Sequence, residues 1–230
     1  MIPAEIYKTI EGKQPAEALR VLTEIFPGRL IFTSSFGIED QVITDIIAQN
    51  KLPIKIITLD TGRLFEETYK VMQKTREKYG NLIEYYFPES AEIEELLRNK
   101  GPYSFYESVD NRKECCHLRK VRPLNRALSG MQCWITGIRA DQSEGRSNMH
   151  NLEWDDHHQL IKYHPLFSWS LEQVRDYIKT QQVPYNILHD KGYISIGCAP
   201  CTRAIQPGED FRAGRWWWEN NDGKECGLHR

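Results

Sequence analysis

The fold of this chain is predicted from the stretch Leu30-Ile31-Phe32-Thr33-Ser34-Ser35-Phe36-Gly37. Its first four residues are apolar or β-branched, which is typical of a buried strand. The next four lead into a helix, because the apolar residues beyond them recur at a spacing close to 3.6. The apolar face of that helix consists of Ile38, Val42, Ile43, Ile46 and Ile47. The stretch therefore predicts a strand, a loop and a helix in that order.

The same alternation continues along the chain. Gly80 and Gly101-Pro102 end two further predicted helices, and Ser90 is the predicted N-cap of the second. The order predicts an α/β fold with an open, mainly parallel sheet flanked by helices. We expect one domain over residues 1–201 and a mobile C-terminal tail over 202–230 that wraps onto it. The predicted strands are 54–59, 82–87 and 133–136, the helices 65–79 and 90–99, and the polar residues 141–158 are interpreted as a long active-site loop.

Length and composition narrow the class of protein. The chain has 230 residues, enough for one large domain with an appendage. Its formal net charge of −2 gives no overall attraction to nucleic acid or an anionic membrane. We find neither a signal peptide nor an apolar run of roughly 18 residues. Six cysteines in such a chain favour metal binding or catalysis over disulfides, and we expect a cytoplasmic protein.

Polar segments follow three of the predicted strands, where open parallel sheets bind their ligands. Ser34-Ser35-Phe36-Gly37 offers hydroxyl and backbone N–H groups that suit phosphate or sulfate, although a plain helix cap would look the same. Asp60-Thr61-Gly62-Arg63 places a carboxylate and a guanidinium directly after a strand. The alternative interpretation is a turn closed by an ion pair. Gly137-Ile138-Arg139 again has an arginine at a strand end. Three such segments together favour a ligand site.

The cysteines fall into two tight pairs and two single residues. Cys115-Cys116 and the turn Cys198-Ala199-Pro200-Cys201 offer four sulfurs for a metal centre. Adjacent cysteines are uncommon in zinc sites, whereas a four-iron cluster has wider sulfur spacing. The alternative is a small buried pair and an unrelated turn. Cys133 lies mid-strand and is predicted to be a core residue.

Cys226 stands alone near the C-terminus, where an exposed thiolate is a strong nucleophile. Lysine and arginine side chains near these thiols could bind sulfate or phosphate oxygens and lower a thiol pKa. The alternative is that they form a solvated charged face. Lys120 and Arg119 lie four residues beyond Cys116 and Cys115, one helical turn away. Arg203, Arg212 and Arg215 lie between the second cysteine pair and Cys226, with Trp216-Trp217-Trp218, a run typical of core or interface packing.

These segments together resemble the sulfonucleotide reductases of sulfate assimilation, and within them the cluster-bearing adenylyl-sulfate (APS) reductases. Any one motif is weak, but all seven in this order are specific, and they cover the chain from about residue 30 to its end. The motifs are Ser34-Ser35-Phe36-Gly37, Leu59-Asp60-Thr61-Gly62-Arg63, Cys115-Cys116 with Lys120, Gly137-Ile138-Arg139, Cys198-Ala199-Pro200-Cys201, Arg212-Ala213-Gly214-Arg215-Trp216-Trp217-Trp218-Glu219 and Glu225-Cys226-Gly227-Leu228-His229.

The resemblance implies a fold like that of the PP-loop pyrophosphatases (adenine nucleotide alpha hydrolase-like) and a thioredoxin-dependent oxidoreductase. In this family a tail cysteine attacks the sulfate sulfur, AMP leaves, and thioredoxin or glutaredoxin releases sulfite from the thiosulfonate. Cys226 would be the nucleophile. Cys115, Cys116, Cys198 and Cys201 would hold one four-iron, four-sulfur (4Fe–4S) cluster per chain, electrostatic or structural in role. The implied substrate-binding residues are Ser34, Ser35, Phe36, Gly37, Asp60, Arg63, Lys120, Arg139, Arg212 and Arg215.

Other functions remain open at this point. A reductase of 3′-phosphoadenylyl sulfate (PAPS), or of both nucleotides, is the nearest alternative. A tRNA-thiolating PP-loop enzyme would need the fuller Ser-Gly-Gly loop for ATP and, in our expectation, a basic face. A zinc-stapled binding module would leave Cys226 and the arginines unexplained. We expect no nucleic acid or membrane partner, and a homo-oligomer is compatible with the sequence.

Overall fold

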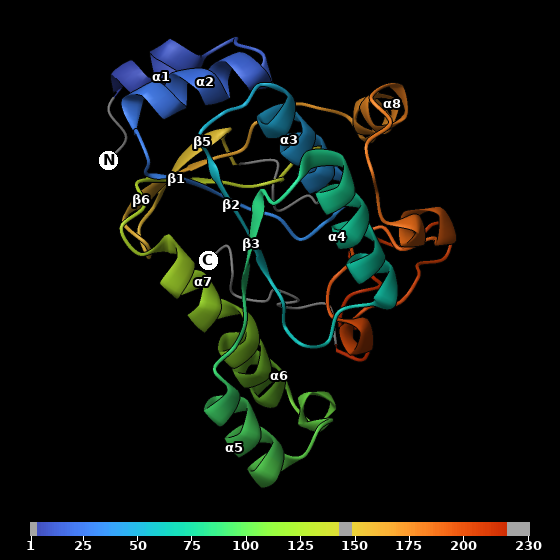
Figure 1. Ribbon diagram of the computed structural model, residues 1–230. Helices are drawn as coiled ribbons and strands as arrows, with labels where there is room; N and C mark the ends of the chain where they lie inside the picture. Colours follow the sequence, from blue (N-terminus) through green and yellow to red (C-terminus); the bar gives the residue numbers. More distant parts are fainter. Residues whose placement is uncertain (1–3, 143–148, 220–230) are drawn as a thin grey trace. The chain divides into compact units, whose positions relative to one another are not determined.

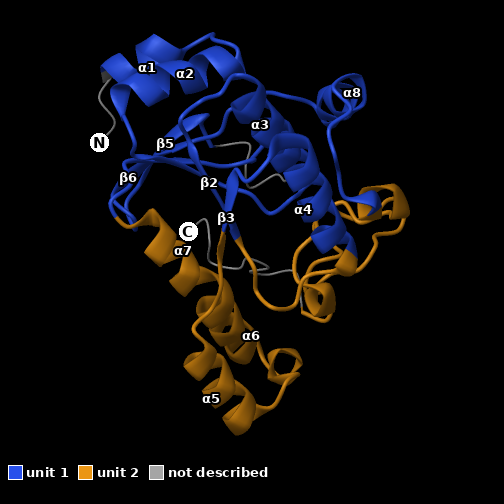
Figure 2. Cartoon of the chain, viewed as in Figure 1, with its two compact units in different colours: residues 1–58, 67–84, 130–187 blue, residues 59–66, 85–129, 188–230 orange. Residues whose placement is uncertain are grey.

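The computed structural model describes residues 4–142 and 149–219 (Figure 1). The chain divides into two compact units, each built from separate stretches of sequence (Figure 2). The first unit contains residues 1–58, 67–84 and 130–187, and the second contains residues 59–66, 85–129 and 188–230. Among the described residues, no helix is both long enough and apolar enough to cross a bilayer.

One six-stranded sheet organises the fold, in the order β3-β2-β1-β4-β6-β5. β1 pairs in parallel with β2 and β4, β4 pairs in parallel with β6, and β5 runs antiparallel to β6. The predicted open, mainly parallel sheet is confirmed. The strand bounds are β1 Leu30–Thr33, β2 Lys55–Leu59, β3 Ile83–Tyr86, β4 Cys133–Ile135, β5 Leu152–Asp155 and β6 Leu160–Tyr163.

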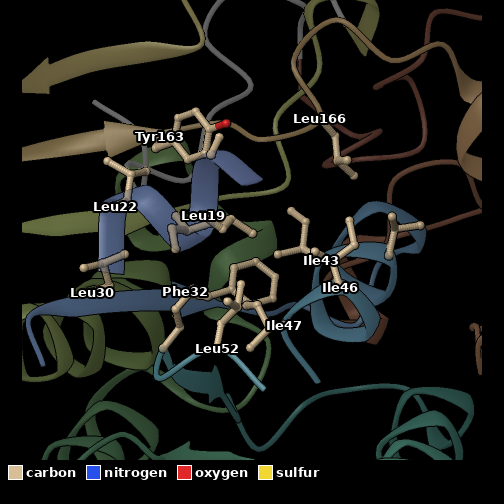
Figure 3. Packing of buried hydrophobic residues seen from close by; sticks show 14 of the residues in the cluster. Leu19, Leu22, Leu30, Phe32, Ile43, Ile46, Ile47, Leu52, Tyr163 and Leu166 are labelled. Atoms are coloured by element: carbon tan, nitrogen blue, oxygen red, sulfur yellow. The ribbon is translucent and has the colours of Figure 1, made fainter. Parts of the chain in front are cut away.

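The first unit has its core where helices cover one face of this sheet. Alternate strand residues such as Leu30 and Phe32 point to that face, as the period of two requires. They pack against Leu19, Leu22 and Ile43 from the helices (Figure 3). The helices that contribute to this core are α1 Ala4–Ile10, α2 Pro15–Ile25, α3 Ile38–Gln49 and α8 Leu171–Thr180.

The predicted helices are present, with one error at a cap. α4 spans Glu66–Tyr79 and α5 spans Ser90–Lys100. The N-cap of α5 is Glu89, and Ser90 is its first helical residue, so the predicted Ser90 cap is wrong. Gly101 ends α5 with a φ of 75°, a backbone conformation that favours glycine.

The predicted loop over residues 141–158 is wrong in part, because residues 152–155 form strand β5. Its polar end is stabilised by pairing with β6. The buried carboxylate of Asp155 accepts a hydrogen bond from Lys162 Nζ at 2.8 Å and one from the His158 N–H at 3.0 Å. These partners lower the pKa of Asp155 to about 2 against the opposing effect of its burial. A charged residue can therefore end a buried strand here.

The second unit carries the first cysteine pair on a helix that changes its winding. α6 spans Val109–Cys116, and the Ser108 side chain caps it by accepting the Asn111 N–H at 3.1 Å. A π-helical segment, η2, follows at His117–Val121 and leads into α7 at Arg122–Leu128. Such π-helical turns are rare and often occur at functional sites. The remaining short helices are η1 Ser104–Tyr106, η3 Ala140–Gln142, η5 Ile187–Lys191 and η6 Ala199–Cys201.

Candidate active site

The Ser34–Gly37 loop of the first unit lies between β1 and the start of α3. Its own hydroxyls hold it in shape: Ser34 Oγ accepts the Phe36 N–H at 3.2 Å, and Ser35 Oγ accepts the Gly37 N–H at 3.4 Å. Phe36 is buried and has a φ of 59°, a conformation uncommon outside glycine. The loop is thus fixed in a tight turn at a helix start, where backbone dipoles favour an anion.

Asp40, in the first turn of α3, holds this loop. Its carboxylate accepts the Ser35 N–H at 2.6 Å and the Ser35 hydroxyl at 2.7 Å. Burial raises the pKa of Asp40 to about 7, although the Ser35 hydrogen bonds oppose the rise. A Cβ atom at Gly137 would overlap the Asp40 carboxylate, so any larger residue there would force that side chain to move. Asp40 therefore fixes one predicted ligand segment and contacts the other.

Arg139, a predicted substrate-binding residue, is almost completely buried in the first unit. Its Nε donates to Glu39 Oε1 at 2.9 Å and its Nη1 to the Trp169 carbonyl at 3.2 Å, and it also pairs with Asp141. The carboxylates neutralise much of its charge. In this conformation Arg139 connects the end of β4 to the first turn of α3.

The Asp60–Arg63 loop belongs to the second unit. Asp60 is buried, and its carboxylate accepts the Gly62 N–H at 2.8 Å, which closes the turn. Arg63 Nη2 donates to the Pro102 carbonyl at 2.6 Å, and its guanidinium lies 4.9 Å from the centre of the Phe105 ring. The Arg63 carbonyl accepts the Ala199 N–H at 2.8 Å, which ties the loop to the second cysteine turn.

Both cysteine pairs line one cavity within the second unit. The cations that line it include Arg63, Arg119 and Lys120. None of the five cysteines in the described part of the chain forms a disulfide. Within the same ranges, no three His, Cys, Asp or Glu side chains form a group that could hold a single metal ion. The lining thiols are Cys115, Cys116, Cys198 and Cys201.

The thiols of the cavity differ in acidity. Burial raises the pKa of Cys201 to about 12, and the neighbouring Cys198 adds to the rise. Burial also opposes ionisation of Cys198, yet the pKa of that thiol is lowered. The charge of Lys120 has the largest lowering effect, followed by a hydrogen bond from Thr61 and the charges of Arg215 and Arg119. Cys198 is therefore in a pocket prepared for a thiolate.

Two buried donors belong to residues near these sulfurs. The indole Nε1 of Trp216 and the Nε of Arg119 have no hydrogen-bond partner within residues 4–142 and 149–219. Trp216 belongs to the same buried cluster as Cys116, Cys198 and Cys201. Buried N–H groups left without an acceptor are unfavourable, so such donors favour an additional acceptor near the cysteines.

Two of the arginines predicted to bind the substrate, Arg212 and Arg215, lie near the Trp216 ring. The guanidinium carbons of Arg215 and Arg212 lie 4.7 Å and 5.9 Å from the ring centre. Arg215 is buried, and its Nε donates to the Cys201 carbonyl at 3.4 Å. Arg112 lies on the same ring at 4.6 Å and forms a buried, two-point ion pair with Glu219. Cys226 lies outside the described residues.

Thr61 contacts the cysteines, which was not predicted from the sequence. Thr61 is buried, and its Oγ1 lies 3.3 Å from Cys198 Sγ. Arg119 Nη1 donates to the Thr61 carbonyl at 2.6 Å. The available signal was the threonine inside the Asp60–Arg63 motif. Cys133, by contrast, is fully buried in β4, as predicted, and burial raises its pKa to about 12.

Comparisons with known proteins identify the family. The family model of the phosphoadenosine phosphosulfate reductase domain matches residues 29–204. The adenosine 5′-phosphosulfate reductase of Sinorhizobium fredii (strain NBRC 101917 / NGR234) is 49% identical, over 96% of this chain and 87% of that protein.

Solved structures agree with this assignment. A phosphoadenylyl-sulfate reductase of Candida auris, in a phosphate complex, superposes with a TM-score of 0.75 at 33% identity over 88% of this chain and 95% of that chain. The FMN adenylyltransferase of Candida glabrata, in complex with ATP, shares the fold alone, with a TM-score of 0.58 at 14% identity over 90% of this chain and 67% of that one. The chain belongs to the phosphoadenosine phosphosulfate reductase domain family, within the sulfonucleotide reductases that its motifs resemble.

Proposed function

We propose that this chain reduces APS to sulfite and AMP through a thiosulfonate on Cys226, with thioredoxin as the reductant. Relatives about half identical over most of the chain are named for APS reduction, as the sequence predicted. The structural observation that carries the proposal is the cavity of the second unit. Four thiols and the cations Arg63, Arg119 and Lys120 line it together. Sulfuryl transfer needs these cations, because the sulfate oxygens repel an attacking thiolate unless positive charges neutralise them.

The reaction divides into two steps with balanced electrons. The Cys226 thiolate attacks the sulfate sulfur, an S–S bond forms, and the S–O bond to the phosphate breaks as AMP leaves with the oxygen. One thiolate of a reduced dithiol protein then attacks Sγ of Cys226. The S–S bond breaks and sulfite leaves with the electron pair. The second thiol closes the disulfide of the reductant and restores the Cys226 thiolate, so the dithiol loses the two electrons that sulfur gains.

Cys115, Cys116, Cys198 and Cys201 would hold one 4Fe–4S cluster. The donor set fits, because thiolates are the preferred ligands of such clusters and this cavity is lined by four of them. The buried Nε–H of Arg119, a residue that lines the cavity, would be a donor to its sulfur atoms. When bound, the cluster would supply a fixed charge near the phosphosulfate rather than an electron. Lys120, Arg212 and Arg215 would neutralise the anionic substrate.

Trapping the intermediate tests the proposal. With sulfur-labelled APS and no reductant, the wild-type chain should release one equivalent of AMP and keep one equivalent of label. Peptide mapping should place that label on Cys226, and reduced thioredoxin should discharge it as sulfite. Cys226→Ser should keep four irons per chain and bind AMP but form no adduct. Sulfite production by Cys226→Ser at the wild-type rate would rule out the mechanism.

PAPS is a second candidate substrate, because the 33% identical structure from Candida auris is named as a PAPS reductase. Initial rates with the two nucleotides at equal concentration distinguish them. APS should be turned over at least tenfold faster. A faster rate with PAPS would reverse the assignment while leaving the Cys226 chemistry intact. A homo-oligomer and a cytoplasmic location stay predictions.

A further inference from the structure

The second unit exposes a group of aromatic side chains that the proposed chemistry does not use. Tyr103, Tyr106 and Trp217 are 65%, 39% and 39% exposed. Their rings are neighbours: Tyr103 stacks on Tyr106 with centroids 6.2 Å apart, and Tyr106 lies 6.4 Å from Trp217. Trp218 lies 4.4 Å from Tyr106 and 4.9 Å from Trp217. We call these four residues the aromatic surface.

Two polar contacts anchor this surface. The Tyr106 hydroxyl donates to the Pro200 carbonyl at 2.7 Å, within the turn that carries Cys198 and Cys201. Glu219, next to Trp218, is fixed by its buried ion pair with Arg112. Exposed aromatic rings that are already fixed lose little conformational entropy when they bind a partner, and they are the usual anchors of protein interfaces.

The aromatic surface is close in sequence to the thiol that the second step of the proposed reaction discharges. Cys226 follows Trp217 by nine positions, a span of at most roughly 30 Å in an extended chain. A protein bound to the aromatic surface is therefore within reach of the thiol that it must discharge. The surface presents four neutral rings, so it suits a partner with an apolar rim around its reactive thiol.

We infer that the aromatic surface is the docking site for the dithiol reductant, a protein of the thioredoxin class. This inference rests on the proposed function and adds to it a location for the partner. Binding there holds the reductant next to the tail, which turns discharge of Cys226 into a reaction between tethered groups. Phe105, whose ring centre is 4.4 Å from that of Tyr106, also lines the cysteine cavity, so the docked protein would lie beside the four thiols.

The test compares discharge by a protein with discharge by a small thiol. The variants are Tyr103→Ser, Trp217→Ser and the double variant, and Tyr7→Ser on α1 is the matched control, because Tyr7 is 42% exposed in the other unit. The chain is loaded with labelled sulfur from APS, and sulfite release is timed with reduced thioredoxin or with dithiothreitol. The double variant should lose about thirtyfold in the thioredoxin rate constant, the loss expected for interface anchors. Its dithiothreitol rate and its burst of AMP should match the wild type, and Tyr7→Ser should be unchanged in all three.

A binding titration separates this inference from the proposed function. Calorimetry of thioredoxin with the Cys226→Ser chain needs no chemistry, and the same double variant should bind at least tenfold more weakly. Weakened binding without any wild-type adduct would retain the docking site and reject the proposed reaction. A thioredoxin rate and affinity unchanged by the double variant would overturn the inference. So would a self-association of the chain that the double variant abolishes without slowing thioredoxin, since the surface would then belong to a second copy.

Discussion

Thr61→Val tests whether the Asp60–Arg63 loop stabilises the turn that carries Cys198 and Cys201. Valine keeps the shape of threonine in this buried position but removes the oxygen that lies 3.3 Å from Cys198 Sγ and accepts the Arg63 N–H at 3.2 Å. A buried group left without its partner costs about 1–3 kcal/mol, and a charged partner such as a thiolate places the loss near the upper end. About 3 kcal/mol corresponds to roughly a hundredfold change in an equilibrium constant.

The assay is cluster loss under anaerobic conditions. An iron chelator is added to the loaded chain, and the visible absorbance is followed over time. Thr61→Val should lose iron up to about a hundredfold faster, while AMP affinity changes less because the backbone contact from Arg119 to the Thr61 carbonyl remains. Thr75→Val, the same change at a buried threonine of the first unit, should retain the wild-type rate. Equal rates of iron loss in all three proteins would refute the coupling.

Three further predictions concern the free energy of unfolding and the Ser34–Gly37 loop. Glu219→Ala removes the two-point partner of the buried Arg112 guanidinium, so urea unfolding should show a loss of about 3–5 kcal/mol, and a loss below 1 kcal/mol would contradict it. Gly137→Ala should push the Asp40 carboxylate away from Ser35 and weaken AMP binding at least roughly tenfold by calorimetry. The raised pKa of Asp40, about 7, means that the folded state binds a proton that the unfolded state releases near pH 4, so stability should fall as pH rises between these values. Asp40→Asn should remove that fall, and equal slopes of unfolding free energy against pH in both proteins would exclude Asp40 as its source.

Among the strands that the sequence predicted, three consist mainly of apolar and β-branched residues. β1, β2 and β4 are bounded by turn residues and buried on both faces, so their pattern is clear in a single sequence. β5 was missed because its Glu153 and Asp155 look like loop residues until His164 and Lys162 pair with them. α8 was missed although it has a local signal, the Ser170 capping box with Gln173.

Some residues of the candidate site could likewise be predicted from the sequence, and others could not. The cysteines could be predicted because two tight pairs of one residue type stand out in a sequence. The partners of single side chains could not, since Glu39 meets Arg139 and Thr61 meets Cys198 only after the chain has folded. Arg139 illustrates the consequence. Its position after a strand predicted a substrate ligand, whereas its carboxylate partners are known only from the structure.

The path of the chain suggests how a group bound to the four cysteines would stabilise the second unit. The second unit is entered three times, and each entry supplies one part: Thr61 and Arg63 from the first, Cys115 and Cys116 from the second, and the Cys198 turn from the third. Bringing together segments so far apart has an entropy cost that grows with loop length. The cavity lining adds a further cost, because it buries thiols beside cations. A group that binds all four sulfurs would offset both costs, since any ligand of the folded state alone stabilises that state. On the proposed function, cluster retention, substrate-loop geometry and the stability of the second unit should therefore change together, and Thr61 is the residue at which the three can be perturbed with the least change in shape.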